Sequence, residues 1–236
     1  MRLDKFICEC TCLSRSEAKK ALKNGCVLLN GEHVNKPEVN IDENNDAVSV
    51  NGKDLVYEKF VYFMLNKPSG VVSATKDNKD KTVTDLITCY ERDDLFPVGR
   101  LDKDTTGLLL LTNDGELAHR LLSPSRKIFK DYYVTCKIPV TKAMCESLSV
   151  GVDINDEEKT LPAIVKMVNN NEMILSICEG RFHEVKRMML AVGNEVVSLK
   201  RISMGTLVLD ESLEPGSFRR LEAFEIASLK EISGIQ

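Results

Sequence analysis

The sequence has no long apolar run, and its longest purely aliphatic stretch is Leu108–Leu111. A helix that spans a bilayer needs about 20 consecutive apolar residues, so we expect no membrane partner. The first residues, Met1–Lys5, carry charges and lack the apolar stretch of a secretory signal. We therefore expect a cytoplasmic protein, and its 43% hydrophobic residues are sufficient for an ordinary packed core.

The eight cysteines follow neither the pattern of a metal site nor that of a disulfide framework. Without an export signal, we expect free thiols in a reducing compartment. Cys8, Cys10 and Cys12 form the one cluster, but their alternate spacing is not the C-x-x-C of a zinc site, and the nearest histidine is His33. We predict no metal there.

The chain also lacks a positive net charge, which is -4 at pH 7. This counts against a protein that coats nucleic acid indiscriminately, because affinity for phosphate grows with clustered Lys and Arg. The local charge differs from the total. From Met1 to Pro37 the basic residues outnumber the acidic ones, seven to four, so the basic charge is concentrated at this end of the chain.

The first region reads as two short helices. An apolar stripe at helical spacing runs from Leu3 to Cys10. A second helix is predicted after Ser14, because Ser14 and Glu17 have the spacing of a capping box, and Gly25 should end it. Arg15, Lys19 and Lys23 recur every four residues and line up on one face of this helix. On an isolated helix, such a face is more often solvated surface than a binding site.

Two Asn-Gly pairs predict tight hairpins after the helices, at Asn30-Gly31 and Asn51-Gly52. Two helices followed by such a hairpin resemble the S4 (αL-type) RNA-binding domain over residues 1–50. We place this domain at 1–52, a polar linker at 53–59 and a second domain at 60–236. The resemblance implies RNA contacts for five cations: Arg2, Lys5, Arg15, Lys19 and Lys20.

The second region mixes strands and helices without a βαβ rhythm and without a glycine-rich phosphate loop. This pattern favours an α+β domain on a mixed, largely antiparallel sheet over a doubly wound nucleotide binder. The elements we expect are helices over 82–87, 116–122, 142–149 and 184–192, and strands over 61–65, 108–112, 131–137, 163–168, 173–178, 196–200 and 207–209.

The densest group of polar residues is the segment 98–107, VGRLDKDTTG, just before an apolar strand. A polar turn is the ordinary explanation for such a composition. Asp102 and Asp104 could instead form a D-x-D pair on Mg²⁺, but two carboxylates do not complete a coordination shell. Arg100 and Lys103 already supply positive charge there, so a metal site ranks last among these alternatives.

Two further segments could carry chemistry. In 179–188, EGRFHEVKRM, Lys186 and Arg187 fall on the first turn of a predicted helix, and a plain basic surface is about as probable as function. In 130–134, KDYYV, two tyrosines are adjacent. Neighbours in a strand point to opposite faces, so at most one of Tyr132 and Tyr133 faces a given cleft.

In this order, the motifs GRLDKDTTGLLLLTNDGELAHRLLSP, KDY and EGRFHEVKRM resemble the bacterial ribosomal RNA pseudouridine synthases that carry an S4 domain. With YFMLNKPSG, the resemblance extends over almost the whole chain. It implies Asp102 as the catalytic aspartate, Tyr132 as the base-stacking ring and Lys186 as the basic partner of the aspartate. Lys186 and His183 favour the branch that acts on small-subunit (16S) RNA, with uridine 516 as the candidate target.

The same resemblance implies RNA contacts for three arginines of these motifs: Arg100, Arg181 and Arg187. Three positions depart from the family pattern. Asp131 stands where relatives often have Thr, Tyr133 follows the expected tyrosine, and Glu184 replaces the more usual glutamine. The second tyrosine leaves open which of the two rings stacks on the base, and Glu184 adds an acid near the site.

Conversion of uridine to pseudouridine is redox-neutral, so we expect no cofactor, and we expect a monomer whose partner is ribosomal RNA. One ionised carboxylate is enough, either to attack C1′ or to remove a sugar proton, and the sequence leaves both roles open. Two alternatives remain: the same chemistry on a 23S RNA hairpin, and a non-catalytic RNA-binding assembly factor. A binding module has no need of a carboxylate that faces RNA, which favours the enzyme.

Overall fold

The computed structural model describes residues 1–11, 13–88 and 94–235. The chain divides into two compact units, with the first beginning at Met1 and the second at Val61. Cys12, a member of the cysteine cluster, lies outside the described residues. Where the structure describes the chain, no helix is long and apolar enough to cross a membrane, and no three His, Cys, Asp or Glu side chains come together as ligands for a metal.

The first unit consists of two helices and a four-stranded antiparallel sheet with the order β2-β1-β3-β4. Its elements are α1 Leu3–Cys10, α2 Arg15–Lys23, β1 Val27–Leu29, β2 Glu32–His33, β3 Val48–Val50 and β4 Lys53–Leu55. The predicted capping box is confirmed: Ser14 Oγ accepts a hydrogen bond from the Glu17 N–H at 3.3 Å, and Glu17 Oε2 accepts one from the Ser14 N–H at 2.8 Å.

Both predicted hairpins are confirmed. Asn30 and Gly31 have φ of 52° and 86°, and Asn51 and Gly52 have 52° and 77°, the left-handed pair that a type I′ turn requires. The second hairpin corrects the expected linker. Since the Asn51-Gly52 turn folds the chain back onto β3, Lys53–Leu55 form β4, and the extended connection starts after them.

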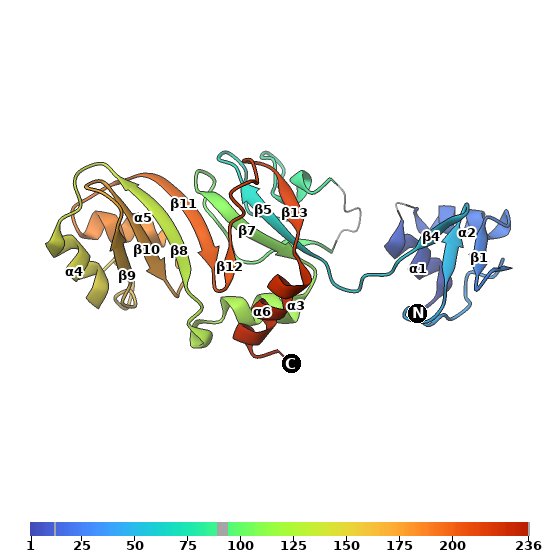
Figure 1. Cartoon of the computed structure of the whole chain (residues 1–236). Coiled ribbons are helices and arrows are strands. Elements are labelled where there is room, and N and C mark those ends of the chain that lie inside the picture. The colour runs from blue at the N-terminus through green and yellow to red at the C-terminus, as the bar shows by residue number, and fades with distance from the viewer. Residues whose placement is uncertain (12, 89–93, 236) are drawn as a thin grey trace. The chain divides into compact units, whose positions relative to one another are not determined.

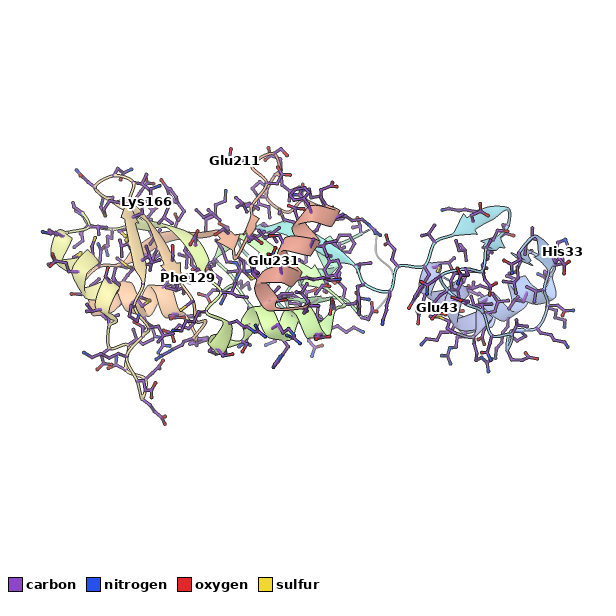
Figure 2. The ribbon with its side chains drawn as sticks, turned by 60° about the horizontal axis from the view of Figure 1, so that its bottom comes forward. His33, Glu43, Phe129, Lys166, Glu211 and Glu231 are labelled. Atoms are coloured by element: carbon purple, nitrogen blue, oxygen red, sulfur yellow. The ribbon has the colours of Figure 1, made fainter. Side chains whose placement is uncertain are left out.

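The core of the first unit lies between the helices and the sheet. Leu3, Phe6 and Ile7 of α1 are fully buried against Leu22 of α2 and the β1 and β3 side chains. Glu43, labelled in Figure 2, pairs with the amino group of Met1 at 2.9 Å. This ion pair ties the start of the chain to the loop before β3.

The second unit has one large sheet, with the order β13-β5-β7-β11-β8-β10-β9, to which β6 and β12 add at β7 and β11. Its strands are β5 Tyr62–Lys67, β6 Phe96–Pro97, β7 Thr106–Thr112, β8 Lys130–Cys136, β9 Ile164–Met167, β10 Glu172–Ile177, β11 Val196–Met204, β12 Leu207–Val208 and β13 Phe218–Arg220. Its helices are α3 Gly115–Leu122, α4 Lys142–Val150, α5 Glu184–Ala191 and α6 Ala223–Ser233, with short 3₁₀ turns η1 Thr84–Leu86 and η2 Pro124–Arg126.

The sheet is mixed: β7 and β11 pair in parallel, and the other pairs are antiparallel. The predicted α+β class is confirmed. Gly107, with φ of 97°, makes the parallel contact possible, because a Cβ there would lie 2.2 Å from the backbone oxygen of Arg201. This close approach brings the start of β7 beside β11, and β11 in turn pairs with β8.

Two elements differ from the sequence-based expectation. β11 runs on to Met204, well beyond the residues 196–200 expected, because the bulge between Arg201 and Ser203 lets the strand continue beside β8. The helix expected over 82–87 is reduced to the 3₁₀ turn η1. There Asp85 Oδ2 accepts a hydrogen bond from the backbone N–H of Thr82 at 2.8 Å, a local turn interaction that competes with regular helix.

Figure 1 shows α3 and α6 side by side next to the part of the sheet that holds β5 and β7, while α4 lies with β9. The main core fills the space under α3 and α6, where Leu108 and Leu110 of β7 meet Leu117 and Leu121 of α3 and Leu229 of α6. All five side chains are fully buried. The strand that follows the Asp102 segment is therefore rigidly held.

Candidate active site

The segment that carries Asp102 is a turn fixed from beneath by a buried lysine. Lys67, the last residue of β5, has no exposed surface. Its Nζ donates to the carbonyl oxygens of Lys103 at 3.2 Å, Thr105 at 2.9 Å and Pro68 at 3.1 Å. Burial lowers the pKa of Lys67 to about 8, although the nearby carboxylates of Asp104 and Asp102 oppose this shift.

No role for Lys67 was predicted from the sequence. The signal that could have found it is a cation at the end of a strand whose other residues are all buried, since a buried lysine needs acceptors within the fold. Two further contacts fix the same turn. Ser73 Oγ donates to the Leu101 carbonyl at 2.8 Å and accepts from the Leu101 N–H at 3.0 Å. The Gly70 N–H donates to the Lys103 carbonyl at 2.8 Å.

The first turn of α5 brings a cation to this turn, as predicted. Lys186 Nζ lies 3.0 Å from Asp102 Oδ2 and 2.6 Å from Asp104 Oδ1. His183, just before α5, places Nε2 at 3.5 Å from Asp102 Oδ1. The side chain of Asp102 is 24% exposed, against 71% for Asp104, so Asp102 is the carboxylate that is largely shielded by the protein.

The shared lysine sets the charge of this group. Its hydrogen bond holds the pKa of Asp104 below the ordinary value. Partial burial opposes the charged form of Lys186, but its hydrogen bonds to Asp104 and Asp102 raise its pKa above the ordinary value. The ammonium group stands between the two carboxylates, where a metal bound to a D-x-D pair would otherwise supply the positive charge.

Tyr132 and Tyr133 point to opposite faces of β8, as the strand pattern predicts. Tyr132 is 8% exposed and lines the same shallow pocket as Asp102. Tyr133 donates its hydroxyl to Glu172 Oε2 of β10 at 2.8 Å and does not line the pocket. The structure thus brings Tyr132, and not Tyr133, to the carboxylate.

The pocket brings together residues from segments far apart in the sequence. The turn before β7, the strand β8 and the start of α5 all contribute, and the predicted residues among its lining are Arg100, Asp102, Tyr132 and Arg181. Thr105, also in the lining, is 2% exposed. A carboxylate, an aromatic ring and cations in one pocket can hold a flat base beside an acid or nucleophile.

Arg181 and Arg187 bind acceptors of their own chain. Arg181 donates to the Glu179 carboxylate at 2.9 Å and to the carbonyl of Lys159 at 2.9 Å. Arg187 donates to the Asp156 carboxylate at 2.6 Å. These contacts hold the loop before β9 next to the start of α5, and the RNA contacts expected of the two arginines stay a prediction.

Glu184, which departs from the family pattern, is a buried acid of the pocket. It is 4% exposed, and its Oε2 accepts a hydrogen bond from the Arg181 N–H at 2.8 Å. Burial, followed by a hydrogen bond to the Glu179 carboxylate, raises the pKa of Glu184 to about 8, while the Arg181 N–H opposes the rise. A carboxyl group with so high a pKa is uncharged at neutral pH, so Glu184 resembles the glutamine expected there.

We expect Glu184→Gln to remove a pH dependence of stability. In the folded protein, Glu184 keeps its proton up to about pH 8. In the unfolded chain, the pKa of the same carboxyl group is 4.5, so the proton is lost at a lower pH. The stabilisation is thus complete below pH 4.5 and is lost as the pH rises to 8. The free energies of unfolding of the two proteins should agree near pH 5 and diverge as the pH rises to 8. At pH 8 the variant should be the more stable by on the order of 2 kcal/mol or more.

Urea unfolding of both proteins at a series of pH values measures this difference. Glu211→Gln, a change at an exposed acid in the turn after β12, is the control and should show no divergence. A constant offset between wild type and Glu184→Gln from pH 5 to pH 9 would contradict the protonated state assigned to Glu184.

The first unit holds the predicted cations around a pocket of its own, with a volume of about 450 Å³. Four of them line it: Arg2, Lys5, Arg15 and Lys19. Asp4 and the first residue, Met1, also line it, and Asp4 pairs with Arg2 at 2.8 Å. Lys20 and Lys23 lie on the same helix but outside the pocket, so the RNA contact expected of Lys20 stays a prediction.

Comparison with known proteins agrees with both units. The family described as RNA pseudouridylate synthase matches residues 61–191, and the S4 domain matches residues 1–47. An uncharacterised RNA pseudouridine synthase of Bacillus subtilis is 45% identical over 98% of this chain and 99% of its own. Ribosomal small subunit pseudouridine synthase A of Escherichia coli is 40% identical over 97% of this chain and 100% of its own.

A solved structure has the same fold. The crystal structure of a pseudouridylate synthase superposes with a TM-score of 0.70 at 41% identity, over 97% of this chain and 99% of that chain. The family and the S4 domain predicted from the motifs are thereby confirmed.

Proposed function

Because the chain belongs to the RNA pseudouridylate synthase family, we propose that it converts one uridine of small-subunit (16S) ribosomal RNA to pseudouridine, with uridine 516 as the target. The observation that carries the proposal is the largely shielded Asp102 carboxylate, paired with Lys186 in a pocket that Tyr132 lines. The choice of small-subunit RNA is supported by the names of full-length relatives from Escherichia coli and Vibrio vulnificus.

In the proposed reaction, Asp102 acts on the sugar of a uridine that has left its stack, either as a nucleophile at C1′ or as a base for a sugar proton. The bond between C1′ and N1 breaks, the base turns over, and a bond between C1′ and C5 forms as C5 loses its proton and N1 gains one. Tyr132 holds the detached base by stacking, which is worth roughly 1–3 kcal/mol per base. Lys186 keeps the carboxylate oriented and compensates its charge.

The first unit extends the contact with RNA in this proposal. Arg2, Lys5, Arg15 and Lys19 face one pocket, and cations gathered in this way bind phosphates. All groups of the proposed reaction come from one chain, which supports action as a monomer. The proposal places the protein in the cytoplasm, with ribosomal RNA, free or in an assembly intermediate, as its partner.

The direct test is a map of pseudouridine in ribosomal RNA from cells with and without this protein. We expect one 16S pseudouridine to disappear and to return when the wild-type gene is restored. An unchanged 16S map with a pseudouridine lost from 23S RNA would replace the substrate. Unchanged maps of both RNAs would favour the non-catalytic assembly factor.

The tyrosine pair gives a second expected result. Tyr132→Ala should lower RNA affinity and turnover about tenfold or more because the stacking face is lost, whereas Tyr132→Phe should keep most of the affinity. Tyr133→Ala removes a half-buried ring on the other face together with its hydrogen bond to Glu172, and should leave turnover within a few-fold. Single-turnover rates and filter binding measure both, and the opposite ranking would assign the stacking role to Tyr133.

The basic pocket of the first unit gives a third expected result. Arg15→Gln combined with Lys19→Gln should weaken RNA binding and reduce the slope of log affinity against log salt by about two, one for each phosphate that is no longer neutralised. Lys23→Gln combined with Lys36→Gln is the matched control, because neither lysine lines the pocket. Equal slopes in the two double variants would mean that the pocket is ordinary solvated surface.

A further inference from the structure

An exposed aromatic ring stands beside the pocket, and the proposed reaction gives it no role. Phe182 is 73% exposed and lies in the chain between Arg181 and His183, both of which line the pocket. Its ring is stacked on the imidazole of His183, with centroids 3.9 Å apart and planes inclined by 17°. One face of the ring is thus covered by His183, and the high exposure leaves the other face to solvent.

The backbone that holds this ring is in a conformation of unfavourable energy. His183 has φ of 48°, a left-handed conformation that costs a non-glycine residue of order 1–3 kcal/mol and that is found preferentially at functional sites. The backbone of Phe182 is fixed as well, because Arg187 Nε donates to its carbonyl oxygen at 2.8 Å. Arg187 is itself held by Asp156 at 2.6 Å.

We propose that Phe182 is a stacking platform for a nucleobase that neighbours the target uridine in the RNA chain. The proposal rests on the proposed function, because it requires a uridine bound at Asp102. His183 links the two places: its ring is stacked on Phe182 and its Nε2 lies 3.5 Å from Asp102 Oδ1. The platform is thus separated from the reacting centre by a single imidazole ring.

The chemistry of base flipping calls for such a surface. When a uridine leaves its stack, its neighbours lose a stacking partner, which costs a few kcal/mol. An aromatic face at the rim of the pocket replaces that partner, and stacking on it tolerates any base because every base has a π-face. A ring braced by His183 loses little freedom on binding, so more of the stacking energy is available for holding the open RNA.

The test uses the full-length protein and a small-subunit RNA hairpin that contains the uridine modified by the wild type. In two versions of this RNA, 2-aminopurine replaces the nucleotide on one or the other side of the target. We expect one version to show fluorescence quenching with wild type. Phe182→Leu should abolish the quenching and weaken RNA binding about tenfold or more, and Phe182→Tyr should restore both.

Phe224→Leu is the matched control, because Phe224 is 72% exposed on α6 and does not line the pocket. Its affinity and quenching should equal those of wild type. An RNA with an abasic site at the quenched position should bind the wild type and Phe182→Leu with the same reduced affinity. Removing the base and removing the ring abolish the same stacking interaction, so their effects should not add.

Wild-type affinity and quenching in Phe182→Leu, or the same losses in Phe224→Leu, would overturn the platform. So would a tenfold loss from Phe182→Leu that persists undiminished on the abasic RNA. If wild type forms pseudouridine while Phe182→Leu matches it in every measurement, only the platform fails. If wild type forms no pseudouridine in any ribosomal RNA, the proposed function fails, and the platform fails with it.

Discussion

Asp102→Asn should lower the single-turnover rate of pseudouridine formation by on the order of a thousandfold or more, as expected when an indispensable catalytic group is lost. The amide keeps the shape of the side chain, but it can neither attack C1′ efficiently nor accept a sugar proton. The turn around it is held by Lys67 and Ser73 through backbone atoms, so the fold should persist. RNA binding should also survive, since a negative charge facing phosphate has been removed.

Asp80→Asn is the matched control for this change. Asp80 pairs at 2.7 Å with Lys103, the residue that follows Asp102 in the chain. The substitution therefore removes one carboxylate charge and one ion pair close to Asp102 without changing Asp102 itself. Exposed pairs of this kind contribute about 1 kcal/mol or less, and the rate should stay within a few-fold of wild type. Near-normal turnover by Asp102→Asn, with thermal stability equal in all three proteins, would remove Asp102 from the reaction.

Much of the first unit could be predicted from short-range chemistry. The Ser14 capping box and the two Asn-Gly turns depend on residues within four positions of one another, so their geometry follows from local preferences alone. Asp102 and Lys186 could be named because their motifs resemble those of a known family. That the two groups meet at 3.0 Å depends on the sheet order, which no local pattern contains.

The parts that could not be predicted from the sequence depend on burial. Lys67 and Glu184 read as ordinary charged residues, yet both are almost completely enclosed, and burial is a property of the packed fold. The extent of β11 could not be predicted for a related reason, because a strand that continues past a bulge is defined by its partner and not by its own residues. The sequence suggested no ion pair for Asp104, whose carboxylate lies 2.6 Å from Lys186 Nζ, closer than that of Asp102 at 3.0 Å.

That shared lysine leads to the second large effect. Lys186→Met should lower kcat/KM by on the order of a hundredfold, because it leaves Asp102 and Asp104 without their common cation, next to the phosphates of a bound RNA. Leaving a partly buried charge without its partner costs several kcal/mol. Lys186→Arg keeps the charge and should retain activity within about tenfold, as expected if the cation matters more than its shape. Thermal melts of all variants separate lost chemistry from unfolding.

A second substitution shows whether Lys186 acts through the carboxylates or only through the packing of α5. In an Asp104→Asn background, Asp102 no longer has a charged neighbour to repel it when the lysine is removed. The loss of kcat/KM caused by Lys186→Met should then be about tenfold smaller than in the wild-type background. This difference corresponds to a coupling free energy of roughly 1.4 kcal/mol between Lys186 and Asp104, which are in direct contact. A purely structural lysine predicts additive losses. Equal losses from Lys186→Met in the two backgrounds would therefore assign Lys186 to the support of α5, while a reduced loss assigns it to the orientation of Asp102.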